Sequence, residues 1–541
     1  MPWWRDGVIY QIYPRSFQDA NGDGVGDLAG IAERLDHLAW LGVDAVWITP
    51  ITVSPDTDWG YDVADYTAVQ PVLGDLDTFD RLVAEAGARG IRVVLDLVPN
   101  HTSAKHPWFR EARASRTSAR RDYYVWADAK PDGSPPNNWR SSFGGPAWTR
   151  DPVTGQYYLH NFLPTQPDLN WWSEAVRQEF DRILRFWFDR GAAGFRIDVC
   201  HKIVKDKELR DNPPAEPGDH PYVARFGQRK VYNSERPEAH DVLRRWRAIA
   251  EEYDPPRLLL GETYVLDVGR LRPFYGNGDE LQLAFNFVFL HSPFTAEGLR
   301  SIVEATERTL DGVPAAWPVW AISTHDLPRY VSRWCDGSPE RARCALLMLL
   351  TLRGTPVLYY GDELGMADVP VPPEQRRDPV GTGSFDAGPG RDPCRTPMPW
   401  STGPGGGFTT PGARPWLPLS SQPGVTVEEQ RADPTSMLML CRDLIALRRS
   451  EPELSGGDYE PLAAPGGLWA FRRGRRFVIA LNLSEVAGSV EVGPSARVRV
   501  ATRRERDGEP VDGGLTLRPW EAAVVETTAR PWRTSGRRRS E

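Results

Sequence analysis

Short apolar runs alternate with longer amphipathic stretches through most of this chain. The apolar runs are typical of buried strands and lie at residues 8–13, 43–50, 93–97, 194–199, 258–260, 281–287, 318–322 and 355–358. Apolar residues at helical spacing predict amphipathic helices over residues 31–41, 76–88, 175–189 and 436–449. Because strands alternate with helices, we predict an α/β fold built on a parallel sheet.

The alternation fails in two places. Residues 102–170 are rich in Pro, Gly, Asn and aromatic side chains and are too long for a structureless loop, so we predict a small inserted subdomain after the third strand. A charged second insert follows the fourth strand over residues 200–241. After residue 454, short strands separated by turns predict an antiparallel C-terminal β-sandwich domain over residues 455–530, followed by a disordered tail at 531–541.

Composition and charge exclude several classes of protein. The net charge of −8 is spread along the chain without a basic stripe, which argues against a nucleic-acid partner. No apolar run is long enough to span a membrane, and no secretory leader is evident at the start. The five cysteines are few and scattered, which favours reduced thiols and a cytoplasmic location over a disulfide framework.

Polar residues that can carry chemistry follow four of the predicted strands. The runs Asp96-Leu97-Val98-Pro99-Asn100-His101, Arg196-Ile197-Asp198, Gly261-Glu262 and His325-Asp326 each place a carboxylate at a strand end. Arg196 and Asp198 are two positions apart, so on a strand they share one face. A structural ion pair in a barrel core and a catalytic carboxylate kept ionised by a cation both fit this pair.

With Gln166-Pro167-Asp168-Leu169-Asn170 and Tyr359-Tyr360-Gly361-Asp362-Glu363, these motifs form an ordered set. The set resembles the α-amylase family of retaining glycoside hydrolases, and within it the α-glucosidase and oligo-1,6-glucosidase branch. The resemblance implies a (β/α)8 TIM barrel formed by residues 1–101 and 171–454, with the subdomain 102–170 inserted after its third strand. The active site of such a barrel lies at the carboxyl ends of the strands.

The resemblance also implies roles for individual residues. Asp198 would be the nucleophile, Glu262 the general acid and base, and Asp326 a third carboxylate that binds ring hydroxyls. The residues implied in sugar binding are Asp58, Tyr61, His101, Phe143, Phe162, Gln166, Arg196, His325 and Arg395. Among them, Asp58 and Arg395 match a pair that in exo-acting relatives grips the terminal 4-hydroxyl, and His101 and His325 would donate hydrogen bonds to the sugar.

Acidic or amide side chains alternate with glycines between residues 19 and 27. Oxygen ligands at this spacing are typical of a loop that wraps a hard cation, although a solvated turn has the same composition. The resemblance implies a structural Ca²⁺ or Mg²⁺ site. Its ligands would be Asp19, Asn21, Asp23, the Val25 carbonyl and Asp27.

We therefore expect an exo-acting retaining α-glucosidase, monomeric or homodimeric, that acts on short α-glucosides. The first alternative is an isomerase on the same scaffold, of the trehalose synthase or sucrose isomerase type, and the second is a non-catalytic transporter heavy chain. Two positions depart from the family pattern: Thr324 stands where Asn is usual, and His201-Lys202 inverts the Lys-His order that amylases carry after the nucleophile. In relatives, Val directly after the nucleophile biases the enzyme toward α-1,6 linkages, so the resemblance implies the same preference for Val199.

Overall fold

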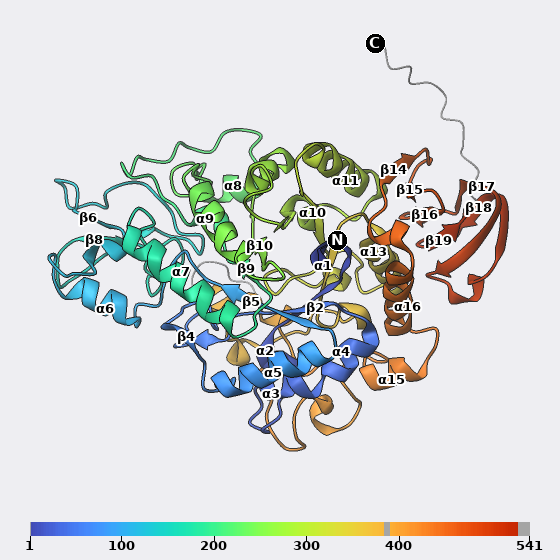
Figure 1. The fold of residues 1–541 in the computed structure, drawn as a ribbon, viewed down its shortest axis with the longest axis horizontal. Coiled ribbons are helices and arrows are strands. Elements are labelled where there is room, and N and C mark those ends of the chain that lie inside the picture. The colour runs from blue at the N-terminus through green and yellow to red at the C-terminus, as the bar shows by residue number, and fades with distance from the viewer. Residues whose placement is uncertain (1, 383–389, 528–541) are drawn as a thin grey trace, which may run out of the picture.

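The computed structural model describes residues 2–382 and 390–527. Figure 1 shows a central barrel with a small region of short strands at one end and an antiparallel sheet at the other. The disordered tail predicted for residues 531–541 lies outside the described residues.

Eight parallel strands form the barrel, each at one of the predicted apolar runs. They are β1 (Ile9–Ile12), β2 (Ala45–Ile48), β5 (Arg92–Leu97), β9 (Gly194–Ile197), β10 (Leu258–Gly261), β11 (Leu283–Ala284), β12 (Val319–Ala321) and β13 (Thr355–Tyr359). Neighbours pair in the order β11-β10-β9-β5-β2-β1-β13-β12, and a parallel bridge between Phe285 and Val319 connects the two end strands. The predicted (β/α)8 barrel is confirmed.

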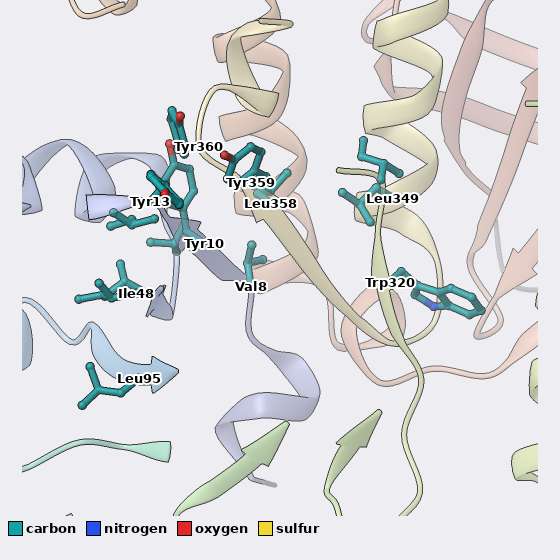
Figure 2. Close-up of a cluster of buried hydrophobic side chains, with 14 of the residues drawn as sticks. Val8, Tyr10, Tyr13, Ile48, Leu95, Trp320, Leu349, Leu358, Tyr359 and Tyr360 are labelled. Atoms are coloured by element: carbon teal, nitrogen blue, oxygen red, sulfur yellow. The ribbon is translucent and has the colours of Figure 1, made fainter. Parts of the chain in front are cut away.

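Alternate residues of each strand point into the barrel or out toward the helices. Figure 2 shows part of the outer cluster, in which Tyr10, Ile48, Leu95 and Leu358 come from four neighbouring strands and Leu349 from a surrounding helix. A separate cluster fills the interior, with Ile9, Ala45, Val94, Leu258, Leu260 and Val357 among its members. Because both faces are buried, the strands are continuously apolar.

Helices cover the outside of the barrel (Figure 1). The longer ones are α5 (Leu76–Ala88), α7 (Glu174–Asp189), α9 (Ala239–Glu251), α11 (Ala296–Leu310), α13 (Pro339–Thr351) and α16 (Met437–Ser450). The helix predicted over residues 31–41 is two helices, α3 (Leu28–Glu33) and α4 (Leu35–Leu41), because Arg34 leaves the helical conformation at φ −101° and ψ 5°. It ends as expected at Gly42, whose φ of 95° forms a left-handed cap.

Both inserts leave the carboxyl ends of barrel strands. The first, after β5, contains α6 (Pro107–Ala114) and an antiparallel sheet of β6 (Trp126–Ala127), β8 (Tyr157–Leu159) and β7 (Trp148–Arg150) in that order. The second, after β9, contains the short helices η2 (Cys200–Lys202) and α8 (Pro221–Phe226). A further pair, β3 (Thr52–Val53) and β4 (Asp65–Val69), brackets the loop that carries Asp58 and Tyr61.

The C-terminal region is an antiparallel domain, as predicted. Its strands are β14 (Tyr459–Leu462), β15 (Leu468–Arg473), β16 (Phe477–Asn482), β17 (Gly488–Ala501), β18 (Pro510–Leu517) and β19 (Ala522–Glu526). Within residues 455–527 these strands are hydrogen-bonded in one series, in the order β14-β15-β16-β19-β17-β18, and the predicted sandwich stays a prediction. The 14-residue β17 pairs with both β18 and β19, with register shifts in each ladder.

Candidate active site

One guanidinium joins three carboxylates at the carboxyl ends of three neighbouring strands. Arg196 Nη1 lies 2.8 Å from Asp96 Oδ1 and 2.8 Å from Asp198 Oδ1, and its Nη2 lies 2.7 Å from Glu262 Oε2. The register of β5 and β9 pairs Asp96 with Arg196, so both side chains enter the barrel. All four side chains are buried. The ion pair predicted from Arg196 and Asp198 is therefore one part of a larger charged cluster.

A strained turn places the two candidate catalytic carboxylates together. Val199, directly after Asp198, has φ 36° and ψ 43°. A β-branched residue in this region costs about 1–3 kcal/mol and is usually found at functional sites. The Val199 backbone N–H donates a 2.8 Å hydrogen bond to Glu262 Oε2. The turn thus orients Glu262 toward the same guanidinium that Asp198 contacts.

The charged cluster retains protons more readily than isolated carboxylates would. Burial raises the pKa of Asp198 well above its ordinary value, the charge of Glu262 adds to the rise, and Arg196 offsets part of it. Burial also raises the pKa of Asp96 to about 6, against the opposing effect of Arg196. Because these carboxyls interact strongly, they titrate as a unit. Such a cluster can present one carboxylate and one carboxylic acid near neutral pH, as two-carboxyl hydrolysis requires.

Asp326 is the carboxylate that stays ionised. Its Oδ1 lies 3.1 Å from both Arg391 Nη1 and Arg395 Nη2, and its Oδ2 lies 3.2 Å from His325 Nε2. Burial alone would raise the pKa of Asp326, but His325, Arg391 and Arg395 together hold it below its ordinary value. Asp326 can therefore accept hydrogen bonds from hydroxyl groups over a wide pH range.

These carboxylates line a cavity of about 240 Å³. The predicted site residues in its wall are Asp58, Tyr61, His101, Phe143, Phe162, Asp198, Glu262 and Asp326. The other four lie behind the wall, each in contact with a residue of it: Gln166, Arg196, His325 and Arg395. The first insert supplies Phe143 and Phe162, whose rings are 5.3 Å apart. Aromatic and charged surfaces thus meet in one small pocket.

His325 lies behind the pocket wall and contacts residues that form it. It has no exposed surface, stacks against Tyr61 with 5.4 Å between ring centroids, and lies 2.6 Å from the Tyr61 hydroxyl and 2.7 Å from Gln11 Nε2. The hydrogen bond to a sugar predicted for His325 stays a prediction; its Nε2 faces Tyr61 and Asp326, which line the pocket. These contacts also orient Tyr61 and Asp326. His101 remains in the wall, 2.9 Å from the Tyr61 carbonyl oxygen.

The partner of Asp58 is Arg391, not the predicted Arg395. Arg391 Nη2 lies 2.7 Å from Asp58 Oδ1, while Arg395 Nε donates to the His325 carbonyl oxygen at 2.8 Å. The reason is Asp378, which accepts hydrogen bonds from both the backbone N–H and the guanidinium of Arg391. These hydrogen bonds to Asp378 orient the Arg391 side chain toward the pocket, and Arg391 forms part of the pocket wall.

Several residues of the wall were not predicted from the sequence. They are Ser142, Val199, His201, Lys202, Tyr222, Arg225, Tyr264, Val380 and Arg391. Most belong to the inserts or to irregular loops, where no apolar period indicates which side chain faces inward. Arg391 belongs to the Arg391-Asp392-Pro393 run, which can be recognised in the sequence. The sequence does not indicate, however, that the Arg391 side chain points into the pocket.

Comparison with known proteins identifies the family. The description "Alpha amylase, catalytic domain" matches residues 11–457, which include the end of β1, all the later strands of the barrel and all three candidate carboxylates. The chain belongs to the α-amylase family. It is a glycoside hydrolase of that family, as the sequence motifs predicted.

Full-length relatives of this α-amylase family member have several activities. The chain is 42% identical to a probable α-glucosidase of Rhizobium meliloti (strain 1021) over 96% of both chains. It is 37% identical to a trehalose-6-phosphate hydrolase of Escherichia coli (strain K12), over 96% of this chain and 98% of the relative. A solved structure of an α-glucosyl transfer enzyme, XgtA, has 39% identity and a TM-score of 0.90, over 97% of this chain and 100% of that one.

No helix in the described part of this family member is long and apolar enough to cross a membrane.

In the loop predicted to bind a cation, backbone N–H groups donate hydrogen bonds to a carboxylate of the same loop. Asp19 accepts hydrogen bonds from the backbone N–H groups of Asn21, Gly22 and Gly24. Burial raises the pKa of Asp27, and the nearby charges of Asp19 and Asp23 add to the rise. Across residues 2–382 and 390–527, no three His, Cys, Asp or Glu side chains are placed together to hold a metal.

The predicted donors, however, include an amide oxygen and a backbone carbonyl, and all of them are hard oxygen ligands of the kind that Ca²⁺ takes. The repulsion among Asp19, Asp23 and Asp27 is also what a cation would relieve. The donor set therefore fits Ca²⁺ or Mg²⁺ in chemical type. The site itself stays a prediction.

If the loop binds Ca²⁺, removal of the ion should lower the melting temperature. A ligand that binds only the folded state stabilises it by mass action, so EDTA should lower Tm by several °C, and Asp23→Ala should do the same without EDTA. Asp132→Ala is a matched control, because Asp132 also accepts a backbone N–H two residues ahead in an exposed turn. An unchanged Tm after both EDTA and Asp23→Ala would make residues 19–27 an ordinary turn.

Proposed function

We propose that this glycoside hydrolase is an exo-acting retaining α-glucosidase that releases glucose from the non-reducing end of short α-glucosides. The observation that carries the proposal is the Asp58–Arg391 ion pair in the wall of the carboxylate pocket, with 2.7 Å between Oδ1 and Nη2. A terminal glucose can give this pair a free hydroxyl. An internal glucose of starch bears another sugar there, which leaves the buried pair unmatched at a cost of several kcal/mol.

The proposed reaction uses the two carboxyls that share Arg196. The Asp198 carboxylate attacks the anomeric carbon while Glu262 protonates the leaving oxygen, which gives a covalent glucosyl-enzyme. Glu262 then removes a proton from water, and the water oxygen replaces Asp198 at the anomeric carbon. Two inversions restore the α configuration. Both carboxylates contact one guanidinium, through Nη1 and Nη2, and this arrangement is compatible with the short separation that retaining hydrolysis requires.

The test is purified protein with maltose, isomaltose, trehalose, sucrose and starch, with each product anomer followed by NMR. We expect α-glucose as the first product from the disaccharides, with Val199 favouring the α-1,6 linkage modestly. Mixed oligosaccharides from starch before glucose appears would contradict the exo-acting pocket. Initial release of β-glucose from sucrose or trehalose, which have no free reducing end, would contradict the retaining mechanism.

Transfer of the glucosyl unit to a sugar is the second candidate, supported by the likeness to the α-glucosyl transfer enzyme. The two reactions share the glucosyl-enzyme and differ in what attacks it. At high disaccharide concentration, new disaccharides or trisaccharides in place of glucose would favour transfer or isomerisation. Two free glucose molecules for each maltose bond cleaved would favour hydrolysis, because transfer frees only the leaving glucose.

The raised pKa of Asp198 predicts how activity depends on pH. A nucleophile must be ionised, so kcat/KM should fall as the pH drops through the pKa of Asp198, at a pH above 3.8, the ordinary value for Asp. The charge of Asp96 contributes to this rise, so Asp96→Asn should move the acid limb to lower pH. A kcat/KM profile measured from pH 3 to 9 tests both. An acid limb at or below pH 3.8 in the unmodified enzyme would contradict the proposed role.

A further inference from the structure

A second cavity, of about 380 Å³, adjoins the catalytic pocket. The two cavities share His201, Lys202, Tyr222 and Tyr264 in their walls. Asp58 and Arg391, which would hold the terminal glucose, line only the first. The second cavity is formed mainly by the insert after β9. If glucose occupies the first cavity, the leaving group extends toward the second.

Two lysines converge on one hydroxyl where the cavities meet. Lys202 Nζ donates to Ser142 Oγ at 2.6 Å, and Lys230 Nζ donates to the same oxygen at 3.3 Å. Lys230 Nζ also lies 3.8 Å from the centre of the Phe226 ring, and Lys202 Nζ lies 5.1 Å from that of Phe162. Since Ser142 accepts both bonds, its own hydrogen remains available to donate.

Neither ammonium group has a carboxylate partner within 4 Å among the described residues. The other charges of the second cavity are paired: Arg229 with Asp219 at 2.8 Å, and Arg270 with Glu235 at 2.7 Å. Buried charges are normally paired, because leaving an ion without water or a counter-ion is costly. Lys202 and Lys230 therefore have no counter-ion in direct contact in the part of the chain that the structure describes.

Burial is the main cause of the lowered pKa values of both lysines. Burial lowers the pKa of Lys202 to about 8, with Glu262, Asp168 and Asp198 offsetting part of the effect and Lys205 opposing them. Burial lowers the pKa of Lys230 well below its ordinary value, and the charges of Lys202, Arg140 and Arg225 lower it further. An anion between the two ammonium groups would reverse these shifts.

We propose that Lys202, Lys230 and Ser142 form a subsite for an anionic substituent, a phosphate or a carboxylate, on the leaving group of the glucoside. The inference rests on the proposed function, since it assigns the leaving-group side of the same reaction. Two ammonium groups and one hydroxyl supply donors to several oxygens of one anion, and the Phe226 ring limits where Lys230 can move. Neutral leaving groups would enter but leave both charges unsatisfied.

Two matched substrate pairs test the subsite. The first pair is trehalose 6-phosphate and trehalose, which differ by a phosphate on the sugar. The second pair is maltobionate and maltitol, whose open-chain leaving groups differ by a carboxylate. We expect kcat/KM to be about tenfold or more higher for the anionic member of at least one pair, as a charge-assisted hydrogen bond provides. The pair with the larger ratio identifies the anion. Ratios of one or below for both pairs would overturn the proposal.

Variants separate this subsite from general effects of charge. Lys230→Met should lower the anionic-to-neutral ratio about tenfold, and Lys230→Arg should keep most of it. The matched control is Lys207→Met, because Lys207 is exposed and lies over the Trp172 ring, outside both cavities. An equal loss of the ratio in Lys207→Met would also overturn the proposal, and thermal melting confirms that each variant folds.

A binding measurement tests the anion subsite even if the proposed glucosidase activity is absent. If no glucoside is hydrolysed, calorimetric titration of the Asp198→Asn variant with trehalose 6-phosphate and trehalose measures the anion preference without turnover. Tighter binding of the phosphate, lost in the double variant with Lys230→Met, would support the subsite even then. Equal affinity for the two sugars would overturn it.

Discussion

Replacement of Asp198 by Asn is expected to lower kcat by about 10³-fold or more while leaving the fold intact. An amide cannot form the glucosyl-enzyme, although it nearly matches the carboxylate in shape. The fold should tolerate the change because Arg196 keeps Asp96 and Glu262 as partners. The substitution also removes an ionisable carboxyl from a cluster in which burial, and then the neighbouring carboxylates, raise the pKa of Asp198.

The measurement is kcat on maltose together with the melting temperature. Asp151→Asn is a matched control, because Asp151 is a fully buried carboxylate that Arg113 contacts at 2.6 Å, in the inserted subdomain and outside the pocket wall. We expect it to reduce stability and leave kcat nearly unchanged. More than a few per cent of kcat in Asp198→Asn would contradict the nucleophile assignment, whereas loss of the fold would point to a structural ion pair.

The barrel was predictable from the sequence because each of its strands is buried on both faces. Such strands must be apolar at almost every position, so their locations stand out without any structural information. The same burial makes a charged residue at a strand end conspicuous, and this is how Asp198 and Glu262 were found. Their convergence on Arg196 follows from the adjacency of β9 and β10, which chain order alone suggests.

Details that depend on one residue's backbone or on distant partners were not predictable. Nothing in the run 31–41 indicates that Arg34 interrupts the helix. The choice between Arg391 and Arg395 depends on Asp378, in an irregular segment without a hydrophobic period. In the same way, Ser142 and Lys230 are 88 positions apart and meet only because two inserts cover the same end of the barrel.

Arg391→Met should open the closed end of the pocket. Arg391 is the cation that contacts Asp58. Without Arg391 the ion pair is lost, and the pocket no longer requires a substrate with a free terminal hydroxyl. We expect kcat/KM on maltose to fall about 10²-fold, the effect of losing one or two charge-assisted hydrogen bonds. The starch-to-maltose ratio of kcat/KM should rise, because the pair no longer discriminates against a substituted 4-oxygen.

Arg395→Met is the matched comparison, since Arg395 is buried, contacts Asp326 at the same 3.1 Å as Arg391 does, and lies outside the pocket wall. If Arg395 only orients Asp326, its loss should lower kcat on maltose and leave the starch-to-maltose ratio unchanged. The two variants thus separate the ion pair that selects chain ends from the one that positions a carboxylate. A ratio that rises in Arg395→Met but not in Arg391→Met would assign chain-end selection to Arg395 and contradict the role of the Asp58–Arg391 pair.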